Sequence, residues 1–133
     1  MDEKNTMELS NFDFPLKNFI KAGYNTILPQ NETKRTGYSN TMYYIISGQL
    51  KITVNGTSYR CDKNSIIHLY RDDEVTIHNP SATQKAEIYY LLFELKEGIT
   101  MDSLAVERVT YDTDGQIYNL CKNIYKAYLS ESI

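Results

Sequence analysis

The stretch that decides the fold is YYIISGQLKITVNGTSYRCDKNSIIHLYRDDE, residues 43–74. Apolar and polar residues alternate along QLKITV, residues 49–54, which is typical of a strand with one buried face. The pair Asn55–Gly56 follows at once and predicts a tight hairpin, because both residue types tolerate positive φ. Further turns at 62–64 and 71–74, and Gly48, separate the remaining segments. The stretch therefore predicts a series of short antiparallel strands.

The same pattern continues on both sides of this stretch. Strands are predicted at 19–29, 41–47, 75–79 and 86–95, and a loop at 30–40. About eight short strands with closely spaced turns are typical of an antiparallel sandwich or barrel. The segment 113–132 predicts a helix, in which Thr113 and Gln116 fit a capping box. We expect one domain, made of an N-terminal arm (1–18), a barrel (19–97) and a helical segment (98–133).

Composition excludes several classes of protein. The 133 residues carry a net charge of −3, which argues against a nucleic-acid surface in this chain. No stretch approaches 18 apolar residues, and the N-terminus, MDEKNTMELS, lacks the apolar run of a signal peptide. Cys61 and Cys121 lie far apart, without a CxxC motif. These features favour a cytoplasmic protein with free thiols and no membrane partner.

Residues 43–79 resemble a cupin, and more closely the N-terminal sensor domain of AraC-family transcription regulators. In such domains an aromatic-rich strand runs into a glycine, then a hairpin, then a G-D-hydrophobic-hydrophobic-x-x-P step. Gly48, VNGTSY (54–59) and KNSIIHLY (63–70) stand at those places, and the resemblance covers roughly residues 20–95. It implies a mainly β fold, a cupin-like antiparallel β-barrel (double-stranded β-helix or jelly roll), followed by a C-terminal helical segment.

The metal motifs of cupins are not matched at their ligand positions. With the last glycine of the first motif on Gly48, its glutamate falls on Thr41 and its histidines fall within residues 34–37. With the end of the second motif on Asn79, its histidine falls on Val75. Transition metals need imidazole, carboxylate or thiolate donors, so we expect a barrel without metal or cofactor.

A small-molecule effector inside the barrel is what the resemblance implies, with Arg35 near its mouth pairing with a carboxylate or hydroxyl groups. Alternation along the strands selects the side chains that would face this cavity. They are Tyr43, Ile45, Val75, Ile77, Ile88 and Tyr90, with Tyr24 as a further candidate on a less regular strand. The alternatives are that Arg35 is a solvated loop charge and that the tyrosines are core packing.

No catalytic residue is expected. His68 and His78 are interpreted as surface or satisfied core histidines, and Cys61 as a bystander thiol despite the neighbouring Arg60. The run at 71–74, RDDE, is interpreted as a solvated turn rather than a cation site. No serine lies in a nucleophile-elbow motif.

An apolar stripe on the predicted helix contains Ile117, Cys121, Ile124 and Tyr128. The stripe itself allows packing on the barrel of its own chain or an antiparallel homodimer. We expect the dimer, mainly from the resemblance.

The predicted function is a ligand-sensing and dimerisation domain of an AraC-type regulator, whose DNA-binding region would lie outside this chain. The chain would then be an excised domain or a stand-alone relative. The alternatives are a small cupin enzyme, such as an isomerase or dioxygenase, or a dimerisation module with a filled barrel. The effector and the direction of regulation are not predicted.

Overall fold

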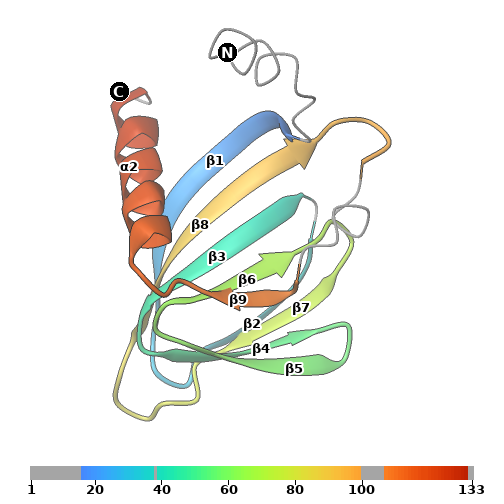
Figure 1. The fold of residues 1–133 in the computed structure, drawn as a ribbon. Helices are drawn as coiled ribbons and strands as arrows, with labels where there is room; N and C mark the ends of the chain where they lie inside the picture. The colour runs from blue at the N-terminus through green and yellow to red at the C-terminus, as the bar shows by residue number, and fades with distance from the viewer. Residues whose placement is uncertain (1–15, 38, 100–106, 132–133) are drawn as a thin grey trace, which may run out of the picture.

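The computed structural model describes residues 16–37, 39–99 and 107–131. Two antiparallel sheets face each other, and helix α2 (Gln116–Glu131) lies outside one of them (Figure 1). The five-stranded sheet has the order β1 (Leu16–Ile27), β8 (Ala86–Leu95), β3 (Asn40–Ser47), β6 (Ser65–Leu69) and β9 (Val109–Tyr111). The four-stranded sheet has the order β2 (Glu32–Thr36), β7 (Glu74–His78), β4 (Gln49–Val54) and β5 (Thr57–Asp62). The chain changes sheet after every strand except β4 and β8, which produces a jelly-roll path.

Two strands lie where the sequence predicted something else. Strand β2 occupies part of the predicted loop at 30–40, and β9 lies inside the segment expected to be helical. The prediction missed β2 because ETKRT has no apolar alternation, and this strand forms by pairing with β7. Strand β1 begins at Leu16, within the expected arm, and register shifts between Leu16 and Asn18 and between Phe19 and Lys21 obscure its pattern.

The predicted hairpin at Asn55–Gly56 is confirmed. These residues have φ angles of 50° and 87° and join β4 to β5. Gly48, between β3 and β4, has φ of 80°, and a Cβ placed there would lie 2.6 Å from the carbonyl oxygen of Lys85. Glycine is therefore required where the chain passes from one sheet to the other.

The space between the sheets holds the main hydrophobic core. Most of its members lie on β3, β4, β7 and β8, and they are joined by Ile27, Cys61, Ile67 and Leu69. Tyr43, Ile45 and Ile88 are buried on this side, while Tyr44 and Tyr89 belong to a second cluster on the opposite face. The predicted alternation of β3 and β8 is therefore confirmed.

Helix α2 (Gln116–Glu131) confirms the predicted helix, but its apolar stripe packs on its own chain. Ile117, Cys121, Ile124 and Tyr128 contact the outer face of the five-stranded sheet, and Cys121 is fully buried. The stripe thus packs on the sheet of its own chain, which is the first of the two alternatives, and the homodimer stays a prediction. Within the described ranges, no helix combines the length and apolar character that crossing a membrane requires.

The start of α2 differs from the predicted capping box. The Asp112 carboxylate accepts hydrogen bonds from the backbone N–H groups of Gly115, Ile117 and Tyr118, at 3.1, 3.4 and 2.9 Å. The N–H of Gln116 donates to Asp114. These carboxylates, rather than Thr113, satisfy the first turn and suit its positive dipole end.

Candidate ligand-binding site

A cavity of about 350 Å³ lies between the sheets, at the edge where β1 of one sheet faces β2 of the other. The volume falls within the usual range for small-molecule pockets. Described residues from five strands line it: Lys21, Asn25 and Ile27 from β1, Thr33 and Arg35 from β2, Tyr43 from β3, Ile77 from β7, and Ile88, Tyr90 and Leu92 from β8. Five of these residues, Arg35, Tyr43, Ile77, Ile88 and Tyr90, are among the eight predicted to bind a ligand.

Arg35 lies on β2, opposite Val75 of β7, so its side chain projects toward the space between the sheets. The centre of its guanidinium group lies 5.6 Å from the ring centroid of Tyr43, within cation–π distance. Its Nε atom is buried and has no hydrogen-bond partner among the described residues. A buried donor without a partner is costly, which makes this atom a natural contact for a ligand acceptor.

Lys21 supplies a second positive charge, from β1. Its Nζ atom lies 5.8 Å from the ring centroid of Tyr90. The Tyr90 ring crosses over Gly23 of β1, where an added Cβ would lie 2.1 Å from Cζ of Tyr90. The missing side chain of Gly23 therefore allows Tyr90 to lie flat against the strand and to close one wall of the cavity.

Three predicted residues lie elsewhere. Ile45 and Val75 face the space between the sheets but are buried in the core and are not part of the cavity wall. Tyr24 pairs with Tyr89 and is on the opposite face of the sheet, where its ring contacts Tyr89 and Tyr125. Its hydroxyl donates to Glu87. The register shifts in β1 explain why its inward face was not evident from the sequence.

Lys21, Asn25, Ile27, Thr33 and Leu92 line the cavity but were not predicted. Alternation could have indicated two of them, since Thr33 lies two residues before Arg35 and Leu92 two residues after Tyr90. The three residues of β1 depend on its register with β8, for which the sequence carries no clear signal.

The cavity wall does not fit a metal of the kind that cupins bind. None of its described lining residues is a histidine, cysteine, aspartate or glutamate. Thr41 and Val75, at two expected ligand positions, are buried, and the Thr41 hydroxyl lies 3.4 Å from the carbonyl oxygen of Ser39. In the described part of the chain, no three potential ligands of these types come together. No chemistry through a metal follows from this donor set.

The two histidines and Cys61, which the sequence analysis considered as chemical groups, all lie away from the cavity. His68 lies on β6, and its buried Nδ1 has no hydrogen-bond partner within the described ranges; burial, with a contribution from Arg108, lowers its pKa. Burial, with a contribution from Asp62, raises the pKa of the Cys61 thiol to about 11. His78 is half-buried on the outward face of β7. None of the three lines the cavity.

The run at 71–74 is only partly the solvated turn that was predicted. Arg71, Asp72 and Glu74 are exposed, but Asp73 is buried and lies 2.6 Å from Nη1 of Arg108. Asp73 also accepts hydrogen bonds from the Tyr70 N–H and the Asn55 side chain. It joins the β4–β5 turn and the β6–β7 turn to the segment leading into β9.

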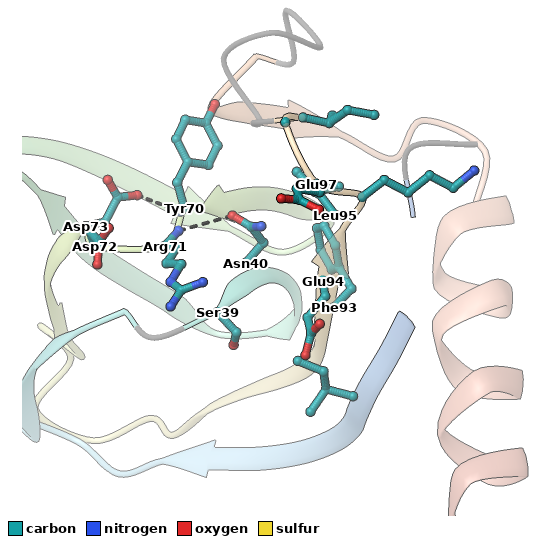
Figure 2. A pocket seen from close by; sticks show the side chains of 14 residues that line it. Ser39, Asn40, Tyr70, Arg71, Asp72, Asp73, Phe93, Glu94, Leu95 and Glu97 are labelled. Carbon is teal, nitrogen blue, oxygen red and sulfur yellow. Dashed lines mark hydrogen bonds between the residues drawn. The ribbon is translucent and has the colours of Figure 1, made fainter. Parts of the chain in front are cut away.

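A larger and more polar cavity, of about 790 Å³, lies where the β6–β7 loop meets the end of β8 (Figure 2). Tyr70 to Asp73, Asn40 and the segment 93–99 line it. Several polar groups there already bond within the loop: the Arg71 N–H donates to Asn40, and the Tyr70 N–H donates to Asp73. Because these polar groups already have partners, the smaller cavity is the stronger candidate for binding a ligand.

Comparisons with known proteins identify the architecture. Neither a protein-family model nor a curated protein matches this chain. Among solved structures, the plu4264 protein of Photorhabdus luminescens aligns with a TM-score of 0.52 and 19% identity over 63% of this chain and 68% of its own. The cupin domain of Cnp3 from Schizosaccharomyces pombe aligns with a TM-score of 0.51 and 24% identity over 55% of this chain and 51% of its own. A Cupin 2 conserved barrel domain protein from Salinispora arenicola aligns with a TM-score of 0.51 and 9% identity over 55% of this chain and 61% of its own.

The matched region thus spans between about half and two-thirds of the length of these proteins. At identities below 25%, the likeness concerns the fold. The chain is a mainly β protein with two antiparallel sheets in the cupin arrangement and a C-terminal helix.

Proposed function

We propose that this chain is a non-enzymatic ligand-binding domain that holds a small molecule in the cavity between β1 and β2. The observation that carries the proposal is the composition of the cavity wall. It combines apolar side chains and two tyrosines with two cationic side chains, and its described residues include no histidine, cysteine, aspartate or glutamate. Such a wall favours recognition over bond-making.

The finer proposal is that the domain senses an effector in the manner of AraC-type transcription regulators. The sequence resemblance around Gly48 and the β-hairpin supports it, together with a helix that follows the barrel. A homodimer is part of this proposal. Because the apolar stripe of α2 packs on its own sheet, dimer contacts would use other surfaces, where Tyr111 and Leu120 are examples of exposed large side chains.

A pair of neighbouring substitutions on β2 tests the binding site. Thr33 is exposed at the cavity wall, while Lys34 is exposed on the opposite side of the same strand. Thr33→Trp should fill the entrance without burying a new side chain in the core, and Lys34→Trp is the matched control. Thermal unfolding is measured with a panel of sugars, aromatic compounds and organic acids.

The expected result is that at least one compound raises the melting temperature of the wild type and Lys34→Trp by several degrees, but not that of Thr33→Trp. Equal stabilisation of both variants would place binding elsewhere and reject this site. Failure of every compound to stabilise the wild type would favour a filled, ligand-free module. Dimerisation is checked by light scattering with and without the stabilising compound.

A further inference from the structure

We infer that the ligand is a small organic monocarboxylate with an apolar body, held by Arg35 and Lys21. This inference rests on the proposed function and names the class of compound that the site takes. It follows from charge, from one unpartnered donor and from the distribution of apolar groups in the wall.

Charge is the first step. Lys21 and Arg35 are the two cationic residues among the described lining, which contains no aspartate or glutamate. The chain as a whole is acidic, with a net charge of −3. An uncompensated positive cavity in an acidic protein attracts an anion, and its partly enclosed position strengthens that attraction relative to bulk water.

The second step is the hydrogen-bonding capacity of Arg35. Its Nε is buried without a partner, and the flat guanidinium group presents two parallel N–H donors to a carboxylate when Nε takes part. A hydroxyl group or a neutral amide presents only one acceptor oxygen to this pair of donors and carries no negative charge to balance the guanidinium group. The group that satisfies this atom best is therefore a carboxylate.

The third step concerns the rest of the cavity. Ile27, Ile77, Ile88 and Leu92 provide apolar surface, while the rings of Tyr43 and Tyr90 lie at an interplanar angle of 67° with centroids 6.5 Å apart. A cavity of about 150 Å³ accepts benzene. The volume of about 350 Å³ therefore has room for a six-membered ring or a short alkyl chain together with a carboxylate.

The position of the two cations also predicts a consequence of binding. Lys21 belongs to β1 and Arg35 to β2. Each of these strands is the edge strand of its own sheet, where β1 pairs with β8 and β2 pairs with β7. A carboxylate contacting both side chains would link the two sheets at their open edge. Ligand binding should thus stabilise the sandwich where backbone hydrogen bonds do not.

The test compares anions with neutral molecules of the same shape. Benzoate and hexanoate, which separate an aromatic from an aliphatic body, are titrated beside benzamide and hexanamide, with affinity measured by calorimetry or by NMR titration. Arg35→Gln and Lys21→Gln remove one charge each. Lys34→Gln and Lys51→Gln remove the same charge from exposed positions outside the cavity wall.

We expect at least one carboxylate to bind, and its amide to bind at least tenfold more weakly. Arg35→Gln should weaken the carboxylate by roughly ten- to a hundredfold, because a hydrogen bond to a charged group is lost. The two control variants should change the affinity less than twofold. Arg35→Lys, which keeps the charge and the packing, should still lose most of the affinity and serves if Arg35→Gln does not fold.

Two results would overturn the inference and leave the proposed function standing. One is an amide or a sugar that binds as tightly as the carboxylates and is excluded by Thr33→Trp. The other is a carboxylate that Arg35→Gln and Lys34→Gln weaken equally, which would indicate attraction to surface charge. If neither anions nor neutral compounds bind, both the inference and the proposed function fail.

Discussion

Tyrosines lie side by side in two strands of the five-stranded sheet and have opposite surroundings. Tyr43 and Tyr90 face the space between the sheets, beside Arg35 and Lys21 and next to a cavity. Their chain neighbours Tyr44 and Tyr89 face α2, where the ring of Tyr118 packs against both of their rings. The four-stranded sheet covers the inner face and α2 covers the outer one, but the inner face is open at the edge between β1 and β2.

On the outer face, α2 and the segment before it use the polar groups that the tyrosines bring. The Tyr44 hydroxyl donates to the Asp112 carboxylate at 2.7 Å, and burial followed by this hydrogen bond raises the pKa of Tyr44 well above its ordinary value of 10.0. On the inner face, the edge between β1 and β2 has no such cover. The comparison teaches that the same residue type becomes core or binding wall according to what closes the space around it.

The largest expected effect comes from removing the carboxylate that connects the outer face to α2. Asp112→Ala deletes a helix cap and leaves the buried Tyr44 hydroxyl with only the longer, uncharged acceptor Oδ1 of Asn64, at 3.0 Å, so the free energy of unfolding should fall by about 2–4 kcal/mol. Urea denaturation measures the change. Asp114→Ala, at an exposed carboxylate that caps Gln116 alone, should cost no more than about 1 kcal/mol. Equal losses for both variants would contradict the connecting role of Asp112.

A smaller effect separates the two faces directly, by removing one hydroxyl from each. Tyr44→Phe should lower the free energy of unfolding by roughly 1.5–3 kcal/mol, because its hydroxyl is hydrogen-bonded to a buried carboxylate. Tyr90→Phe should change it by less than about 0.5 kcal/mol, because its ring borders an open cavity. The same denaturation measurement applies. A Tyr90→Phe variant as unstable as Tyr44→Phe would mean that the inner face is core like the outer one.

The smallest effect is a difference in local opening between the two faces, measured by how fast the thiol on each face reacts. Burial, with contributions from Asp62 and Asp112 respectively, raises the pKa of Cys61 and Cys121 to about 11, so both are unreactive in the closed protein. Cys121 lies under α2, while Cys61 is in the core between the sheets. We expect Cys121, measured in Cys61→Ala, to react with a disulfide reagent roughly tenfold faster than Cys61 in Cys121→Ala, because a single helix on one face of a sheet opens locally more readily than the core between two sheets.

The control for this experiment is labelling in concentrated guanidinium chloride, where both thiols should react at similar rates. Equal rates in the native protein would show that the helix and the sandwich open as one cooperative unit. A faster reaction at Cys61 would instead place the weakest point of the molecule at the open edge between β1 and β2.

Most of the cavity wall contributed by strands with strong alternation could be predicted. Arg35, Tyr43, Ile77, Ile88 and Tyr90 were named from parity and from the resemblance, and the cavity contains all five. The contribution of β1 could not be predicted, because its register shifts move the inward face to Lys21, Asn25 and Ile27 and leave Tyr24 on the other side. The sequence also did not determine which surface packs against the apolar stripe of α2, because such a stripe fits any apolar surface.

The sequence by itself determined the strands with regular alternation, the hairpin at Asn55–Gly56, the helix and the lack of metal donors at Thr41 and Val75. These features depend on local backbone preference and residue chemistry, which neighbours in the chain decide. Only the tertiary structure decided that β2 is a strand, that α2 covers the outer tyrosines, and that Lys21 and Arg35 line the same cavity. Those outcomes depend on pairing between segments far apart in the chain, and no local pattern specifies such pairing.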